Sequence, residues 1–156
     1  MSEQVWKPRV TVAAVIERDG RHLLVRETVR GQPRLNQPAG HLEPGESLLE
    51  AVVREVHEET ARPFTPTALV GIYLWRAAPG HDTFLRVTFA GQVGEPLPGL
   101  ALDPDIDDTE WLGIAEIEAR ADECRSPLVL TAIRDHATGQ AYPLALLKTL
   151  LDTATA

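Results

Sequence analysis

Short apolar runs separated by polar, turn-forming segments dominate the first part of the chain, which is typical of β-strands. The segments 10–16 and 22–27 are predicted strands, because both are rich in aliphatic residues and flank a hairpin signal at Asp19-Gly20. Further strands are predicted in three later segments: 67–77, 82–93 and 110–112. Residues 30–45 are rich in Pro, Gly and Asn, so we expect a loop there.

The hydrophobic spacing changes to that of a helix after this loop. A helix is predicted from Glu46 or Ser47 to about Thr60, with one apolar stripe that must face the core. The stripe consists of Leu49, Val52, Val53 and Val56. Two further helices are expected near 114–122 and 126–138. Strands interspersed with helices in this order predict an α/β fold in which a mixed central sheet lies between helices.

Composition narrows the possible functions. The 156 residues carry a formal net charge of −8, which argues against binding to nucleic acids or anionic membranes. No apolar stretch approaches the ~20 residues of a membrane span, and the N-terminus does not resemble a signal peptide. The single cysteine excludes an internal disulfide, and no repeat or break in composition divides the chain. We therefore expect one cytoplasmic domain over residues 1–156, as a monomer or small homo-oligomer.

An acidic cluster lies beside the apolar stripe of the long helix. Glu55, Glu58 and Glu59 stand at positions i, i+3 and i+4, so their carboxylates share an arc of the helix surface. Oxygen-only ligands of this kind suit a hard cation such as Mg²⁺, with Mn²⁺ as a second possibility. Taken alone, such a cluster is more often a solvated helix face. The loop before the helix changes that balance.

The segment from Gly40 to Arg62, GHLEPGESLLEAVVREVHEETAR, resembles the Nudix box. The matching positions of that 23-residue pattern are Gly40, Glu46, Arg54, Glu55, Val56, Glu58 and Glu59. Ala61 and Arg62 depart from it, since the pattern has Gly and an aliphatic residue there. The resemblance implies the family's α/β/α sandwich, a divalent metal, and a small phosphorylated substrate that is hydrolysed at a phosphoanhydride bond.

Segments beyond the box are similar to one bacterial phosphatase branch of the same family, among them NQPAGHLEPGESLLEA, FLRVTFAG and DIDDTEWL. This narrower resemblance implies removal of the terminal phosphate from nucleoside tri- and diphosphates and from pyrimidine pyrophosphates of thiamine biosynthesis. Two alternatives remain open. One is a Nudix pyrophosphohydrolase that cleaves nucleoside diphosphate derivatives internally, and the other is a domain that binds nucleotides without cleaving them.

The resemblance also implies roles for individual residues. Glu58 and Glu59 are expected to be metal ligands, and Glu55 is expected to be either a ligand or the base that deprotonates the attacking water. The backbone carbonyl of Ala39, just before the box, is a plausible further ligand. Glu46 and Arg54 are expected to form a structural salt bridge between the loop and the helix.

Other candidates are less determined. Four residues are candidates for substrate binding, although each also fits an ordinary structural position: Arg9, Arg26, Asn36 and Arg86. A fourth carboxylate for the site is expected from the acidic loop DPDIDD, with Asp105 and Asp107 as candidates. A solvated acidic turn is the alternative for these two.

The exit of the long helix is unusual, because Ala61 stands where glycine would permit a left-handed turn. Keeping that turn with alanine would cost about 1 kcal/mol. Pro63 offers another way to stop the helix, since proline cannot continue it. We expect the helix to end near Thr60–Ala61 with the acidic arc intact.

Overall fold

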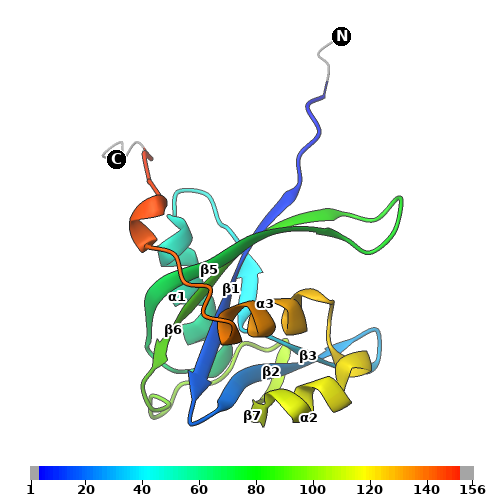
Figure 1. The fold of residues 1–156 in the computed structure, drawn as a ribbon, viewed down its shortest axis with the longest axis vertical. Coiled ribbons are helices and arrows are strands. Elements are labelled where there is room, and N and C mark those ends of the chain that lie inside the picture. The colour runs from blue at the N-terminus through cyan, green and yellow to red at the C-terminus, as the bar shows by residue number, and fades with distance from the viewer. Residues whose placement is uncertain (1–3, 152–156) are drawn as a thin grey trace.

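The computed structural model describes residues 4–151, and these form a twisted mixed sheet with helices on both sides (Figure 1). The strands are β1 (Arg9–Arg18), β2 (Arg21–Val29), β3 (Gln32–Asn36), β4 (Ala39–His41), β5 (Phe64–Arg76), β6 (Thr83–Val93) and β7 (Ile106–Gly113). The strand order is β3-β2-β1-β6-β5, with β4 paired to β1 and β7 paired to β2. Of the strand pairs within residues 4–151, β1 and β6 run parallel and the other five pairs are antiparallel. The mixed central sheet predicted from the sequence is confirmed.

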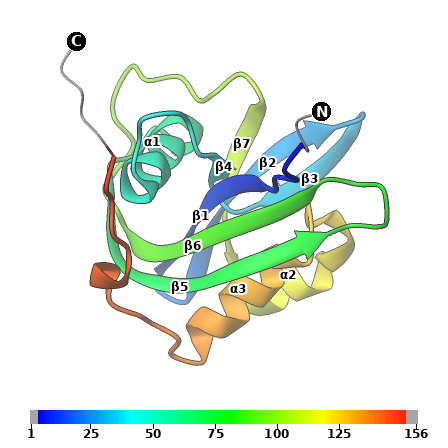
Figure 2. The ribbon, with the colours of Figure 1, turned by 90° about the horizontal axis from the view of Figure 1, so that it is seen from above.

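Helix α1 (Leu48–Thr60) covers one face of the strands β1, β6 and β5, and helices α2 (Ile114–Ala119) and α3 (Leu128–Ala137) lie on the opposite side (Figure 2). A short 3₁₀ segment, Ala121–Glu123, follows α2, and another, Leu144–Leu146, follows α3. The predicted α/β sandwich is therefore observed. No helix within residues 4–151 is long and apolar enough to cross a membrane.

Two apolar cores correspond to the two helical layers. The core under α1 contains Val52 and Val56 of the helix packed on Val12 and Phe89 of the sheet. The core under α2 and α3 contains Ile117 and the apolar face of α3, packed on β1, β2 and β7. Strand β1 contributes to both cores because its alternate side chains point to opposite faces. The central strands are thereby fixed between two packed layers.

The prediction of a loop over residues 30–45 is wrong, because this segment contains β3 and β4. A two-residue turn joins β2 to β3, with Arg30 at φ 51° and Gly31 at φ 76°. The predicted turn at Asp19-Gly20 has the same left-handed pair of residues. Asp-Gly is a strong sequence signal for such a turn, whereas arginine rarely adopts a positive φ, so the second hairpin carried no comparable signal.

Helix α1 begins with a capping box at Ser47. The Ser47 hydroxyl accepts from the Glu50 amide at 3.1 Å, and the Glu50 carboxylate accepts from the Ser47 amide at 2.7 Å. This arrangement satisfies two amides that the first turn of a helix leaves free. It holds the register of the helix, and hence the positions of its glutamates.

Helix α1 ends at Thr60, as predicted, and its exit keeps the left-handed turn at Ala61, with φ 55°. The left-handed turn at Ala61 therefore ends the helix, and the alternative in which Pro63 ends it is not observed. The carbonyl of Ala61 accepts from the Leu97 amide at 2.8 Å, so the loop after β6 packs on the helix end. Arg62 occupies the position that is aliphatic in the box. Its side chain packs against the Trp111 ring, with the guanidinium carbon 5.7 Å from the ring centre.

Candidate active site

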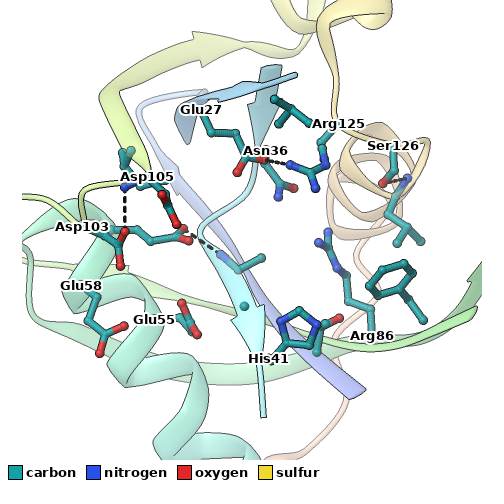
Figure 3. Close-up of a pocket in the computed structure, with 18 of the residues that line it drawn as sticks. Glu27, Asn36, His41, Glu55, Glu58, Arg86, Asp103, Asp105, Arg125 and Ser126 are labelled. Atoms are coloured by element: carbon teal, nitrogen blue, oxygen red, sulfur yellow. Dashed lines mark hydrogen bonds and ion pairs between the residues drawn. The ribbon is translucent and has the colours of Figure 1, made fainter. Parts of the chain in front are cut away.

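A cavity of about 1040 Å³ opens between the C-terminal half of α1, strands β4 and β6, and the segment that enters α3 (Figure 3). Carboxylates from α1 and from the loop before β7 lie on one side of it. Guanidinium and amide groups lie on the other side, near α3. The cavity therefore has an acidic wall and a cationic wall.

The acidic wall brings together the three glutamates of α1, since Glu55, Glu58 and Glu59 all line the cavity. Asp103 joins them from the loop before β7, and its amide donates to the carbonyl of Glu58 at 2.8 Å. Asp105 also lines the cavity, and its amide donates to the Asp103 carboxylate at 2.8 Å. The loop is thus tied to the helix at the point where its carboxylates enter the site.

Arg54 is the cation that organises this wall. Its guanidinium donates to both carboxylate oxygens of Glu46, at 2.7 and 2.9 Å, which clamps the loop before α1 to the helix. It also donates to Glu55 at 2.9 Å, to Glu58 at 3.3 Å and to the carbonyl of His41 at 3.0 Å. One partly buried guanidinium therefore offsets the repulsion among several carboxylates.

Burial and mutual repulsion shift the pKa values of two glutamates in the acidic wall, Glu55 and Glu59. Burial raises the pKa of Glu55, although the hydrogen bond and charge of Arg54 oppose that shift. The pKa of Glu59 is raised to about 9, chiefly by burial and then by the charges of Glu55, Glu27 and Asp103. Glu55 has the smaller exposed area of the two, and it is paired with Arg54. Glu59 forms no ion pair with any of the described residues, and it accepts from the Ala39 amide at 3.0 Å. Glu59 is the acid most in need of a positive neighbour.

These residues fit a divalent cation. The donors are all oxygen atoms, Glu55 and Glu59 have raised pKa values, and a nearby cation would relieve the repulsion among the carboxylates. Within residues 4–151, however, no three acidic, histidine or cysteine side chains surround a single point as ligands of one ion. Glu55 and Glu58 are turned toward Arg54, and Glu59 is turned toward the Ala39 amide. Metal binding would thus require these flexible carboxylates to rotate.

Gly40 leaves room for the Glu55 carboxylate, because a Cβ at position 40 would lie 2.1 to 2.4 Å from the carboxyl atoms of Glu55. We predict that Gly40→Ala displaces this flexible carboxylate and reduces kcat on the order of 100-fold, the effect of losing one well-placed polar group. The free energy of unfolding, measured in urea, should change by less than about 1 kcal/mol, since the tip of one side chain can move.

Gly20→Ala is the matched control for this substitution. Gly20 has φ +74° and open space around its Cβ position, and it does not line the cavity. The control should lose about 1 kcal/mol of stability with unchanged kcat, the reverse of the Gly40→Ala pattern. Full activity of Gly40→Ala would contradict the proposed place of Glu55 in the reaction.

The cationic wall contains two of the four candidates for substrate binding. Arg86 and Asn36 are both buried and both line the cavity. Arg9 instead pairs with Asp82 on the surface, and Arg26 pairs with Glu110; neither arginine lines the cavity. A substrate-binding role for Arg9 and Arg26 stays a prediction without support from their positions.

The acidic loop contributes differently from expectation. Asp105 and Asp107 both line the cavity, but Asp107 also accepts from Thr28 at 2.7 Å across the entrance. Asp103, which the sequence did not single out as a candidate, is the member of this loop that raises the pKa values of Glu55 and Glu59 by its charge. Its backbone contact with α1 places it there, and this contact had no sequence signal of its own.

Sequence reasoning also missed residues of the cationic wall. Arg125 and Ser126 line the cavity just before α3, and Arg125 pairs with Glu27 at 3.0 Å. A basic residue directly before a Ser-Pro helix start was a usable signal, because helix N-termini favour anions. The carbonyl of Ala39 remains a predicted ligand, and Ala39 itself lines the cavity.

Comparisons with known proteins point to one family. The family model described as the NUDIX domain matches residues 6–131. Phosphatase NudJ of Escherichia coli is 42% identical over 143 residues, which cover 92% of each chain, and the protein of the same name from Shigella sonnei is equally similar.

Solved structures give the same picture. A NUDIX hydrolase from Nitrosomonas europaea superposes with a TM-score of 0.89 at 50% identity, covering 92% of this chain and 98% of the other. The MutT protein from Methanosarcina mazei has a TM-score of 0.69 at 23% identity, covering 88% of this chain and 99% of that one, a similarity in fold alone.

Proposed function

Because this chain belongs to the Nudix hydrolase family, we propose that it removes the terminal phosphate from nucleoside tri- and diphosphates and from pyrimidine pyrophosphates of thiamine biosynthesis. Nudix hydrolases are enzymes that act on phosphoanhydride bonds, and the proteins called phosphatase NudJ are similar along 92% of this chain. The observation that carries the proposal is the cavity with carboxylates on one wall and guanidinium groups on the other.

In the proposed reaction, water attacks the terminal phosphorus in line with the bond to the leaving oxygen. Glu58 and Glu59 would hold Mg²⁺ or Mn²⁺, with the Ala39 carbonyl and one carboxylate of the acidic loop as further ligands. A divalent cation held there would screen the phosphate oxygens and lower the pKa of water. Glu55 is either another ligand or the group that takes the proton from water. Its carboxylate accepts from Arg54 at 2.9 Å, and the ligand role would require it to turn away from this bond.

The proposal also covers the domain organisation, the cellular location and the oligomeric state of the enzyme. A single domain over residues 1–156 is supported by the family match to residues 6–131 and by one sheet that joins all seven strands. We propose that the enzyme acts in the cytoplasm, as a monomer or small homo-oligomer.

A panel of substrates with Mg²⁺ tests the proposal. It should contain nucleoside tri- and diphosphates, a pyrimidine pyrophosphate, and nucleoside diphosphate derivatives such as dinucleotides. We expect inorganic phosphate as the released product from the first three classes. Release of pyrophosphate or of a nucleoside monophosphate instead would identify the pyrophosphohydrolase, and binding without any product would identify a sensor.

A further inference from the structure

Arg86 is a buried cation without a carboxylate partner. It lies in the middle of β6 and is only 8% exposed, yet within residues 4–151 it forms no ion pair. Its Nε has no hydrogen-bond partner in the part of the chain that the structure describes, and one terminal nitrogen donates to the Gln37 side chain at a long 3.3 Å. Burial lowers the pKa of Arg86 to about 10, so the fold holds its charge at a cost. Such a group needs an explanation other than stability.

Among the described residues no carboxylate forms an ion pair with Arg86, although the charges of Glu59 and Glu27 favour its charged form. Figure 3 shows its guanidinium pointing toward Arg125, Asn36 and Ser126 across the cationic wall. The charge of Arg125 opposes that of Arg86, although Arg125 itself pairs with Glu27 at 3.0 Å. Asn36 adds a buried Oδ1 that also lacks a partner. An anion between the two arginines would remove the repulsion and use their free donors.

A helix terminus strengthens the same point. Helix α3 begins at Leu128, and Ser126 and Leu128 line the cavity at that end. The N-terminus of a helix carries partial positive charge and favours anions, although that alone would not make a site. Here it coincides with a buried, unpartnered arginine aimed at the same space. Gln37 holds that arginine in place, since its amide nitrogen donates to the Val129 carbonyl at 2.8 Å.

We infer that Arg86 and Arg125, with the N-terminus of α3, form an anion subsite that binds the phosphate retained on the organic product, opposite the carboxylates that act on the terminal phosphate. The inference rests on the proposed function for the identity of the second phosphate. It assigns the site a minimum substrate of two directly linked phosphates. A phosphate monoester would leave one of the two walls without a partner.

The subsite has a defined part in the reaction. The oxygen of water forms a bond to the terminal phosphorus, and the bond between that phosphorus and the bridging oxygen breaks. The bridging oxygen stays on the retained phosphate with the electron pair, while a carboxylate of the acidic wall takes a proton from water. Arg86 and Arg125 stabilise the negative charge that develops on the retained phosphate. Inorganic phosphate leaves from the acidic side.

Calorimetric titration of the full-length protein with inorganic phosphate, in EDTA, tests the subsite without the metal. We expect saturable binding by the wild type in the millimolar range. Arg86→Gln should weaken it about 10- to 100-fold, the loss expected for one charge-assisted hydrogen bond. Arg86→Lys should bind more tightly than Arg86→Gln, because it keeps the charge. Arg21→Gln is the control, since Arg21 pairs with Glu116 on the surface, and it should bind as the wild type does.

The outcomes separate this inference from the proposed function. No binding by the wild type, or equal binding by Arg86→Gln, would overturn the subsite whatever the enzyme hydrolyses. Metal-free phosphate binding that depends on Arg86 supports the subsite even if the released product is not inorganic phosphate. Thermal unfolding checks the variants, and Arg86→Gln should be at least as stable as the wild type because it removes an uncompensated buried charge.

Discussion

Glu59→Gln should abolish hydrolysis and at the same time stabilise the metal-free protein at about pH 8. The activity should fall at least roughly 100-fold, because the variant loses a charged group at the reacting centre. The amide oxygen of Gln keeps an acceptor for the Ala39 amide, which bonds Glu59 at 3.0 Å, so the local structure has no reason to collapse. A loss of activity together with a gain in stability is the result expected for an acidic residue that serves catalysis and destabilises the fold.

The pH dependence follows from the direction of the shift. Glu59 has a pKa raised from 4.5 to about 9 in the folded protein, so folding favours its neutral form. Below pH 4.5 Glu59 is protonated in both the folded and the unfolded protein, and its contribution to the free energy of unfolding is at its maximum. That contribution is lost progressively as the pH rises from 4.5 toward 9. At neutral pH this loss amounts to as much as about 3 kcal/mol, and the glutamine variant escapes it.

Urea unfolding of both proteins in EDTA, from pH 5 to pH 9, measures this effect. The stability advantage of Glu59→Gln should grow with pH and should shrink when Mg²⁺ is added, since the metal binds the wild type more tightly. Glu118→Gln is the control, because Glu118 lies on the surface and pairs with Arg134. Undiminished turnover by Glu59→Gln with Mg²⁺ would remove Glu59 from the site.

Arg54→Met should unfold more easily than the wild type by about 2 to 4 kcal/mol and should lose most of its activity. Arg54 is the shared donor to Glu46, Glu55 and Glu58, and its side chain is only 23% exposed. Methionine fills a similar volume but leaves three carboxylates facing one another. Arg54 also bonds the carbonyl of His41, so the loop before α1 loses its attachment as well.

Arg134→Met is the matched control for this experiment. Arg134 pairs with Glu118 at 2.8 Å, but both side chains are about half exposed, at 56% and 44%. Arg134→Met should lower the free energy of unfolding by less than about 1 kcal/mol. Combining Arg54→Met with Glu46→Gln should destabilise less than the sum of the two changes, because the double variant no longer buries an unpaired Glu46. Equal losses for Arg54→Met and Arg134→Met would show that the cluster adds nothing to stability.

The regular elements were predictable because their patterns are local. The stripe from Leu49 to Val56 and the capping position at Ser47 place α1 almost to the residue. The expectation that the whole stripe faces the core is wrong for Val53, which is 36% exposed, because the helix turns this position toward solvent. The hairpin at Asp19-Gly20 has a specific turn signal, and it forms. The hairpin after β2 does not have one, because its left-handed position is held by Arg30, so β3 was not anticipated.

The walls of the cavity were only partly predictable, because they depend on contacts between distant segments. Three arginines on strands were equivalent candidates, and nothing in the sequence separates them. Arg86 is buried because its strand lies between β1 and β5, whereas Arg9 begins an element and stays on the surface. Asp103 enters the acidic wall through a backbone bond to α1 that no side-chain pattern encodes.

The left-handed alanine at the end of α1 changes how the motif should be written. As a string of letters, the box of this chain is damaged at its last two positions, Ala61 and Arg62. In the structure, however, both positions keep the conformation and packing that the motif requires. Ala61 has the left-handed φ of 55°, and the Arg62 side chain packs on the Trp111 ring. A search that requires glycine there would discard a chain whose backbone obeys the rule. Divergent relatives are better recognised by the turn that the position must make than by the residue that usually makes it.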